Sequence, residues 1–392
     1  MAGVGPMSEP LVLMVIIPDR LSDLAAKGEI TARYYNPGDL FDEVHIVMTN
    51  NDRPDPGPLA KTVGLARLFL HNLPLPSFVL TLGWQPRLIR NWVRAGINLA
   101  RQIRPALIRT HGNYGNGYLA AQIKKHLGIP LVVSLHTHPD VSQRRATPWR
   151  ANWKRRLALE AMVKFEIETL KSADWVLPVY ESIRGYARRR GAKRLEVCYN
   201  VINPEFLRPK EFYALHRPPR IISVSRQIPG KNPENLIRAM ARLPEAELTL
   251  VGDGEGHAHL QEVARECGLA PRVTFRPRVP NDELCPLLPE FDLFAAHSDY
   301  WEISKSVLEP LLTGLPVVLN LRPGEPVPEL QGDFLLLVDN TPEGYAQALT
   351  RLLTDDRFRE DLGRRAYAHA QARWSPKVTE AKYVEIYRSL LT

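Results

Sequence analysis

The sequence contains few cysteines and no long apolar run. Its three cysteines, Cys198, Cys267 and Cys285, are odd in number and form no C-x-x-C pair, so we expect neither a disulfide framework nor a structural zinc site. The first apolar run, Leu11–Ile17, is far shorter than the roughly 20 residues of a membrane-spanning helix. It also lacks the basic leader and cleavage site of a secretory signal. We therefore expect a cytoplasmic protein without a transmembrane segment.

Repeats and low-complexity tracts are also absent, although the 392 residues include 34 prolines and 24 glycines. A solenoid is thereby excluded, and the length predicts two or three globular domains. The charge is uneven along the chain. The first 185 residues contain 23 Lys and Arg against 15 Asp and Glu, and the remainder contains 28 of each, so the net charge of +8 belongs to the first part. This asymmetry favours an anionic partner, such as nucleic acid, phospholipid headgroups or a phosphorylated substrate.

Short apolar runs alternate with helical patterns in two successive sets, which is typical of parallel sheets covered by helices on both faces. We therefore predict two doubly wound α/β domains, at residues 1–205 and 206–375, followed by a helix at residues 376–392. The proline-rich segment 203–219 is the expected linker. The predicted strands are Leu11–Pro18, Val44–Met48, Ala106–Arg109, Pro130–Leu135 and Trp175–Pro178, then Arg220–Val224, Glu247–Val251, Arg272–Arg276, Leu293–Ala296, Pro316–Leu319 and Phe334–Val338.

Two predicted strand ends of the second domain carry candidate ligand-binding residues. Arg226 and Lys231 flank a Pro-Gly turn after the strand 220–224, where they could converge on a diphosphate or remain solvated. Gly252 and Gly254 follow the next strand. Glycines at that place allow either a close backbone approach to a ligand or only a sharp turn.

The segment 297–316 combines a strand end, a polar loop and a predicted helix start. Ser306 and Glu309 have the spacing of a capping box, and free N–H groups at that helix start would bind phosphate oxygens. Glu309 could instead accept hydrogen bonds from the hydroxyls of a ribose.

The first domain offers weaker signals. His136 and His138 follow a predicted strand, but two histidines without a third ligand make a poor metal site, and we expect no metal. The loop 110–118 is rich in glycine and amides, which suits either a polar ligand or an ordinary connection.

Basic residues gather at Arg87, Arg90, Arg94, Arg101 and Arg104 on one predicted helix, and at Arg144, Arg145, Arg150, Lys154, Arg155 and Arg156 beside Trp149 and Trp153. The region Arg144–Arg156 suits an anionic membrane surface or a solvated face, and nucleic acid is disfavoured because no reader motif is present.

Taken in order, these segments resemble the retaining glycosyltransferases of the GT-B fold, family 4, over nearly the whole chain. The resemblance rests on Arg226-x4-Lys231, on Val251-Gly252-Asp253-Gly254, and on Glu309-Pro310-Leu311-Leu312-Thr313-Gly314-Leu315-Pro316. It implies two Rossmann-like domains with a C-terminal helix that crosses back to the first domain. It also implies transfer of a sugar from a nucleoside diphosphate sugar to a hydroxyl acceptor, without a cofactor or a metal.

The resemblance also implies roles for individual residues. Arg226 and Lys231 would neutralise the leaving diphosphate, and Glu309 would bind the nucleotide ribose. The backbone at Ser306 and Val307 would meet the phosphates. His136 would lie near the transferred sugar, and Arg278 would contact the nucleobase. The expected catalytic residues are His136, Arg226, Lys231 and Glu302, and the expected donor-binding residues are Gly252, Gly254, Arg278, Lys305, Ser306, Val307 and Glu309.

The chain departs from the family pattern at two places. The family has Glu-x7-Glu, but eight residues before Glu309 stands Trp301, and the available acid is Glu302 at Glu-x6-Glu. Either a one-residue slip of the loop lets Glu302 contact the donor sugar, or that contact is absent and Lys305 or backbone groups replace it. The loop 19–29 after the first strand lacks the family's paired glycines. The donor sugar, the base, the acceptor and the oligomeric state therefore stay open. The acceptor would be a lipid-linked or anionic carbohydrate at the inner membrane face, and the alternatives are a nucleotide-sugar epimerase, a phosphorylase or a non-catalytic binding partner.

Overall fold

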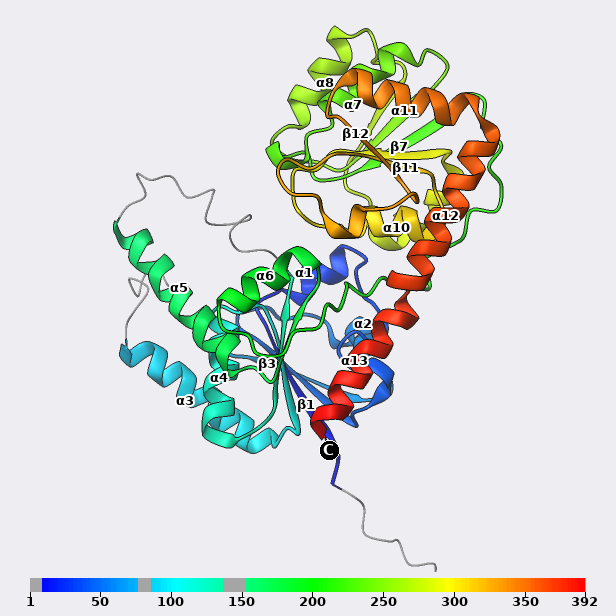
Figure 1. Cartoon of the computed structure of the whole chain (residues 1–392). Coiled ribbons are helices and arrows are strands. Elements are labelled where there is room, and N and C mark those ends of the chain that lie inside the picture. The colour runs from blue at the N-terminus through cyan, green and yellow to red at the C-terminus, as the bar shows by residue number, and fades with distance from the viewer. Residues whose placement is uncertain (1–8, 77–85, 137–152, 392) are drawn as a thin grey trace, which may run out of the picture. The chain divides into compact units, whose positions relative to one another are not determined.

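The computed structural model describes residues 9–76, 86–136 and 153–391. Its contacts divide the chain into two compact units. The first unit contains Met1–Ala26, Ile30–Val201 and Thr379–Thr392, and the second contains Lys27–Glu29 and Ile202–Val378. Each unit is built around one six-stranded sheet, and each is described by itself (Figure 1).

The first sheet is parallel, with strand order β3-β2-β1-β4-β5-β6. All six residues of β1 are buried, as expected for a central strand that is covered on both faces. The strands are β1 (Val12–Ile17), β2 (Glu43–Met48), β3 (Arg67–Asn72), β4 (Leu107–His111), β5 (Leu131–Leu135) and β6 (Trp175–Pro178).

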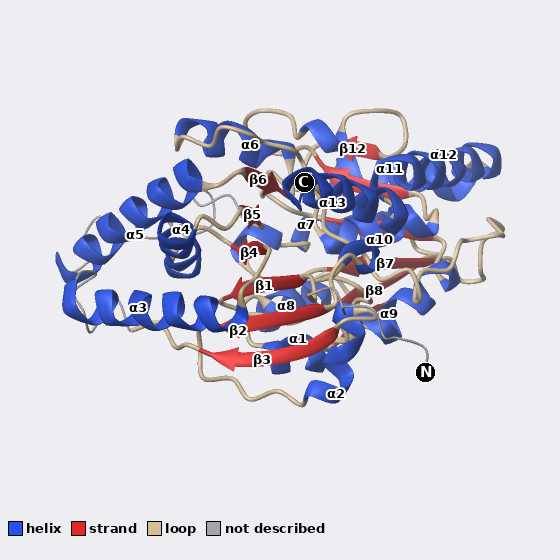
Figure 2. Cartoon of the chain, turned by 90° about the horizontal axis from the view of Figure 1, so that it is seen from below, coloured by secondary structure: helices blue, strands red, loops and turns tan. Residues whose placement is uncertain are grey.

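Helices cover both faces of this sheet (Figure 2). On one face, Leu13, Val15 and Ile17 of β1 share a core with side chains of the last helix, among them Tyr383 and Tyr387. Figure 1 shows α3, α4 and α5 on the opposite face. The helices of the first unit are α1 (Leu21–Ala26), α2 (Pro56–Leu59), α3 (Pro86–Ile103), α4 (Gly115–Leu127), α5 (Trp153–Ser172), α6 (Glu181–Arg189) and α13 (Pro376–Leu391).

The second sheet repeats this plan. Its order is β12-β11-β10-β7-β8-β9, which is the order of the first sheet read from the other edge. The strands are β7 (Arg220–Val224), β8 (Glu247–Val251), β9 (Val273–Arg276), β10 (Leu293–Ala296), β11 (Val317–Asn320) and β12 (Leu336–Val338). The helices are α7 (Glu234–Ala239), α8 (His257–Glu266), α9 (Asn281–Leu287), α10 (Lys305–Thr313), α11 (Pro342–Thr354) and α12 (Asp356–Trp374).

The core of the second unit explains where its helices lie. Side chains of α7, α8 and α11 pack with Ile221, Leu248 and Val318 of the sheet in one cluster. In Figure 1, α10 lies on the other face of this sheet, and its residues from Val307 to Thr313 are all buried. The described helices include none that is both long enough and apolar enough to span a bilayer.

The predicted architecture of two doubly wound α/β domains is confirmed. The strand β3 was not predicted from the sequence, because its residues alternate between partly buried and exposed instead of forming a continuous apolar run. Arg104 was predicted to lie on one helix with Arg101, but α3 ends at Ile103 and Arg104 has a left-handed backbone, with φ of 52°.

Candidate functional site

The second sheet has a topological switch point between β7 and β10. These strands pair with each other, while the chain continues from β7 to β8 on one side and from β10 to β11 on the other. The loops that leave the carboxyl ends of two such strands diverge and open a crevice, which is where ligands bind in doubly wound sheets. The loop after β7 carries Arg226 and Lys231, and the loop after β10 carries Glu302.

The side chain of Lys231 is only 11% exposed, and its Nζ lies 3.3 Å from Oε1 of Glu302. Burial lowers the pKa of Lys231, the nearby Glu302 opposes that shift, and the positive charges of Arg226 and Arg322 add to it. The ammonium also lies 5.5 Å from the ring centre of Tyr300. The site therefore concentrates positive charge around a lysine that is poorly solvated, which favours an anionic ligand.

Backbone contacts hold the two loops together. The N–H of Asn232 donates to Nδ1 of His297 at 3.0 Å, and the N–H of Asp299 donates to the carbonyl of Gly230 at 2.9 Å. These bonds flank Lys231 on both sides in sequence. They fix the turn that carries the lysine against the end of β10, so the distance from Lys231 to Glu302 is set by the main chain as well as by the ion pair.

The predicted glycines Gly252 and Gly254 pack against the loop after β7. Their φ angles are 129° and 149°, and a Cβ atom would lie 2.1 Å from the carbonyl oxygen of Ser225 at the first position and 2.4 Å from that of Gln227 at the second. The side chain of Gln227 in turn donates to the carbonyl of Gly252 at 2.8 Å. These glycines thus permit a close approach between two loops of the protein itself.

The predicted capping box of Ser306 and Glu309 is wrong. The helix α10 begins at Lys305 and its N-cap is Ser304, so Ser306 lies inside the first turn and its hydroxyl is 3.0 Å from that of Ser304. The backbone N–H of Ser306 precedes the first helical hydrogen bonds, which Val307 and Leu308 donate to the carbonyl of Ser304, and the positive end of the helix dipole lies at this start of α10.

Glu309 is a buried carboxyl group in the second turn of α10, only 3% exposed. It accepts a hydrogen bond of 2.7 Å from Nδ2 of Asn281 at the start of α9. Burial raises the pKa of Glu309 to about 7, against opposing effects of Asn281 and Lys305. A buried carboxyl with one protein partner retains acceptor capacity for a further donor, but it does not cap its helix.

Sequence reasoning missed Arg322, which follows β11. Its side chain is 9% exposed. Its Nε donates to the carbonyl of Tyr300 at 3.1 Å, and its Nη1 donates to the carbonyl and the side-chain oxygen of Asn320 at 2.9 and 2.7 Å. Asn320 also accepts from the N–H of Ser298 at 2.9 Å. Arg322 thus fixes the loop that carries Glu302, and only its position just after a strand could have indicated it.

The remaining predicted donor residue, Arg278, is exposed and follows β9. In the first unit, His136 follows β5, and its Nδ1 lies 3.3 Å from Oδ1 of Asn200. Its ring is 4.9 Å from that of His111, a residue whose pKa is held well below the usual range by burial, with smaller effects of Arg109 and of His136 itself. His136 therefore belongs to a histidine pair at the carboxyl edge of the first sheet.

Three other predictions concern the loop after β1, the basic region Arg144–Arg156 and the absence of a metal site. Where the family has paired glycines, this chain has the short helix α1, and Asp52 accepts from the N–H and Oγ of Ser22 at 2.9 and 2.6 Å. Of the basic region Arg144–Arg156, residues 144–152 lie outside the described residues. Across the described ranges, no group of three or more His, Cys, Asp or Glu side chains is placed to hold a metal ion.

Comparisons with known proteins agree with this geometry. One family model, described as Glycosyltransferase Family 4, matches residues 40–206, and a second, described as Glycosyl transferases group 1, matches residues 209–369. The two matches follow one another along the chain. The first contains β2 to β6 of the first sheet, and the second contains the whole second sheet. The chain therefore belongs to the group 1 glycosyltransferases of the family 4 type, which have the GT-B fold.

Individual relatives share low sequence identity with this chain, and the curated ones match only part of it. The chain is 30% identical to the lipopolysaccharide core biosynthesis glycosyltransferase LpsE of Rhizobium meliloti, over 44% of this chain and 50% of that protein. It is also 30% identical to a GDP-mannose-dependent phosphatidylinositol monomannoside mannosyltransferase of Mycolicibacterium smegmatis, over 46% and 50%. The chain thus spans about half the length of these curated relatives. The structure of Anabaena HepE in complex with UDP and glucose superposes with a TM-score of 0.69 at 18% identity, covering 97% of this chain and all of that one.

Proposed function

We propose that this protein is a retaining glycosyltransferase that moves a sugar from a nucleoside diphosphate sugar to a hydroxyl acceptor. The observation that carries the proposal is Lys231, a largely buried cation beside Glu302 at the switch point of the second sheet. The site next to it contains two further cations, Arg226 and Arg322. A UDP complex of a protein with the same fold supports a nucleotide-sugar donor.

In this proposal the diphosphate is the leaving group, and its developing negative charge is the charge that the site stabilises. Arg226 and Lys231 are already placed on one loop, so little reorganisation is needed when the bond to the sugar breaks. Each well-placed donor of this kind contributes roughly 3–4 kcal/mol to catalysis. The N–H groups at the start of α10 supply further donors to the phosphates, so the reaction needs no metal ion.

Glu309 would accept hydrogen bonds from the two ribose hydroxyls of the donor, because it has acceptor capacity beyond its bond from Asn281. Gly252 and Gly254 would act on the donor indirectly, by letting the loop after β8 support the loop that carries Arg226. Arg278 would contact the base. Glu302 would meet a hydroxyl of the donor sugar in place of the family's first acidic residue, since it already pairs with Lys231.

The acceptor hydroxyl would attack the sugar on the face that the diphosphate leaves, so that the anomeric configuration is retained. The new bond joins the acceptor oxygen to the anomeric carbon, and the bond from that carbon to the phosphate oxygen breaks. The acceptor proton goes to an oxygen of the departing phosphate. No carboxylate of the protein attacks the sugar, and His136 lies near the transferred sugar in this proposal.

The experiment that tests this function is incubation of the protein with a panel of labelled nucleotide sugars, chosen beforehand by which donors raise the melting temperature. Release of the nucleoside diphosphate with transfer or hydrolysis of the sugar is the expected result. Interconversion of two nucleotide sugars would instead identify an epimerase, and binding without turnover a non-catalytic partner.

The acceptor would be lipid-linked or an anionic carbohydrate, and the protein would work in the cytoplasm at the inner face of the membrane. The excess of Lys and Arg over Asp and Glu in the first 185 residues supports this placement. Flotation with vesicles that contain anionic lipid is expected to carry the protein upward, whereas neutral vesicles are not.

A further inference from the structure

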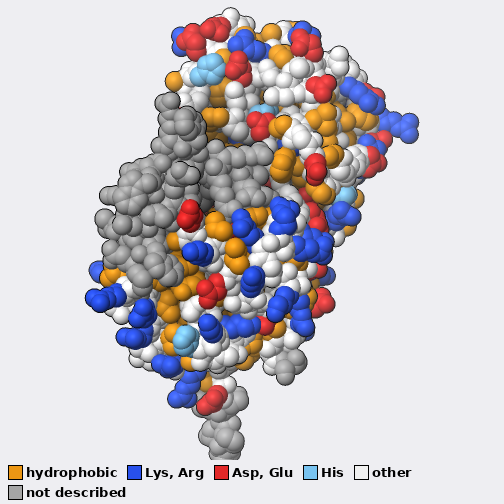
Figure 3. All heavy atoms as spheres, turned by 60° about the vertical axis from the view of Figure 1, so that its left-hand side comes forward, with side chains coloured by type: hydrophobic (Ala, Val, Ile, Leu, Met, Phe, Trp, Pro, Cys, Tyr) orange, Lys and Arg blue, Asp and Glu red, His pale blue; other side chains and the backbone are white. Residues whose placement is uncertain are grey.

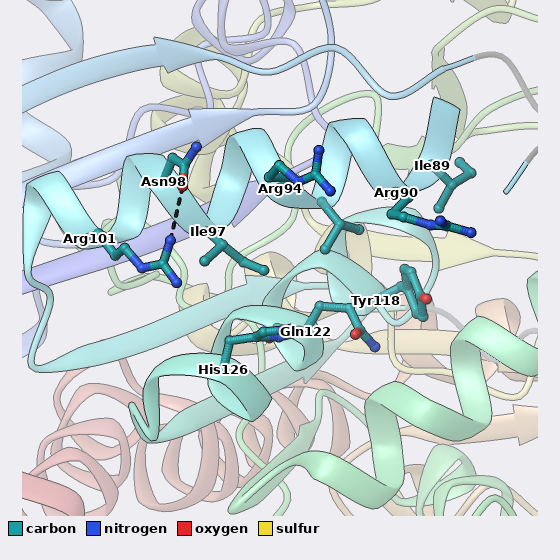
Figure 4. Close-up of a pocket in the computed structure, with 10 residues that line it drawn as sticks. Ile89, Arg90, Arg94, Ile97, Asn98, Arg101, Tyr118, Gln122 and His126 are labelled. Carbon is teal, nitrogen blue, oxygen red and sulfur yellow. Dashed lines mark hydrogen bonds between the residues drawn. The ribbon is translucent and has the colours of Figure 1, made fainter. Parts of the chain in front are cut away.

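The first unit has a groove between α3 and α4 with a volume of about 540 Å³. Figure 4 shows its walls, with one row of side chains on each helix. The volume is within the range of 300–1,000 Å³ that is usual for ligand sites. Its lining residues are Ile89, Arg90, Val93, Arg94, Ile97, Asn98 and Arg101 of α3, and Tyr118, Gln122 and His126 of α4.

Helical periodicity and one glycine explain why the groove forms. Ile89, Val93 and Ile97 recur every four residues, so they share one face of α3. At Gly96 a Cβ atom would lie only 2.6 Å from Cδ1 of Leu119. The two helices therefore touch through Gly96, and the longer side chains on either side form the walls of the groove.

The floor of the groove is apolar and its rim is cationic. Arg90, Arg94 and Arg101 line it and are exposed, and Nη1 of Arg101 donates to Oδ1 of Asn98 at 3.1 Å. The lining residues within the described part of the chain include no Asp or Glu, and an acidic group that contacts them is Glu168 of α5, which accepts a hydrogen bond from Gln122. Figure 3 shows Lys and Arg side chains in excess over acidic ones on this face of the first unit. A ligand of this groove must therefore combine an apolar part with a negative charge.

The small exposed area of the floor decides which apolar part fits. The floor residues Ile89, Val93 and Ile97 lie in one row along α3 and are only 4%, 8% and 6% exposed, so they offer a thin apolar strip and not a broad apolar surface. A single alkyl chain matches such a strip. From Ile89 to Arg101 the helix rises by about 18 Å, and a guanidinium at either end suits a phosphate.

We propose that this groove binds an anionic phospholipid from a membrane surface, with the phosphate beside Arg90 and Arg94, which are one helical turn apart, and one acyl chain along the floor toward Arg101. The inference extends the membrane placement in the proposed function and does not depend on sugar transfer. It assigns membrane contact to α3 and α4, whereas the sequence pointed first to the region Arg144–Arg156.

The first test fills the groove without changing the charge. Asn98→Trp adds an indole at a lining position that is exposed, and Asn91→Trp makes the same change at an exposed position of α3 that does not line the groove. Binding is measured by flotation with vesicles of phosphatidylglycerol in phosphatidylcholine. N98W is expected to weaken binding at least tenfold and N91W less than threefold, with unchanged thermal unfolding in both.

The second test changes the charge. Arg90→Gln with Arg94→Gln is expected to weaken binding on the order of thirtyfold, and Arg188→Gln with Arg189→Gln on α6, an equal loss of charge in the same unit, less than threefold. Equal effects of N98W and N91W, or of the two arginine pairs, would show that the groove is not the lipid-binding site, although the protein still binds membranes. If the wild-type protein does not bind these vesicles, both the lipid-binding groove and the proposed membrane placement are wrong. The nucleotide-sugar assay tests the proposed transferase activity independently of that result.

Discussion

Glu309 shows how one buried carboxyl group makes the stability of the fold depend on pH. Burial raises its pKa to about 7, so the folded protein binds the proton more tightly than the unfolded chain does. This group's contribution to stability is therefore complete below the ordinary pKa of 4.5, and it is lost as the pH rises through about 7.

Glu309→Gln removes this titration while keeping an oxygen that can accept from Asn281. We expect the free energy of unfolding of E309Q, relative to the wild type, to increase between pH 5 and pH 8 by at most about 3 kcal/mol. Urea unfolding at both pH values measures it. A difference that stays constant with pH would show that Glu309 is not buried in the way described.

Arg322 is a second single residue on which the site depends, through the geometry of its hydrogen bonds and not through a titration. Its guanidinium fork holds the carbonyl of Tyr300 and the backbone and side chain of Asn320, a pattern that an ammonium cannot reproduce. Arg322→Lys and Arg322→Met are therefore both expected to lower kcat/KM for the donor about tenfold or more. Full activity of R322K would show that only the charge matters at this position.

At the scale of elements, the loops after β7 and β8 depend on each other. Ala at position 252 would combine an unfavourable φ of 129° with a Cβ atom 2.1 Å from the carbonyl oxygen of Ser225. We expect Gly252→Ala to lower the free energy of unfolding by about 3 kcal/mol. Gly268→Ala is the control, because Gly268 has a φ of 68° with no atom within 4 Å of the added Cβ and should cost only about 1 kcal/mol. Equal losses in urea unfolding would contradict the close packing of the two loops.

The elements also show what the sequence could predict. Buried parallel strands such as β6 and β10 appear as continuous apolar runs, so their bounds were predicted correctly. The alternating edge strand β3 was not found, because half of its side chains are exposed. The start of α10 was placed too late, since Ser304 and Ser306 are both acceptable N-caps by residue type. Arg322 was missed because its role depends on a neighbouring strand that is close only in the folded chain.

At the scale of the whole molecule, the last helix completes the core of the first unit. Tyr387 of α13 is fully buried, and its ring lies 6.0 Å from that of Phe41. Arg109 of β4, also buried, lies with its guanidinium carbon 4.7 Å from the ring centre of Tyr383. The helix itself could be predicted from the sequence, and the family resemblance implied its return to the first domain. Its individual contacts could not be predicted, because partners such as Phe41 and Arg109 are more than 270 residues away.

Tyr387→Ala is therefore expected to destabilise the first unit by about 3–5 kcal/mol, through the loss of a buried aromatic side chain. Glu385→Ala, an exposed position on the same helix, should change stability by less than about 0.5 kcal/mol. Thermal unfolding measures both. Similar melting temperatures for the two variants would contradict the docking of α13 on this core.

The most direct measurement is the affinity of the wild type and of Lys231→Ala for a nucleoside diphosphate and for the matching nucleoside, together with turnover of the donor. We predict that the wild type prefers the diphosphate strongly, that K231A loses most of this preference and at least tenfold in turnover, and that exposed Lys377→Ala changes neither. If K231A binds the diphosphate and turns over the donor as the wild type does, then this lysine does not hold the leaving group and the proposed mechanism is wrong.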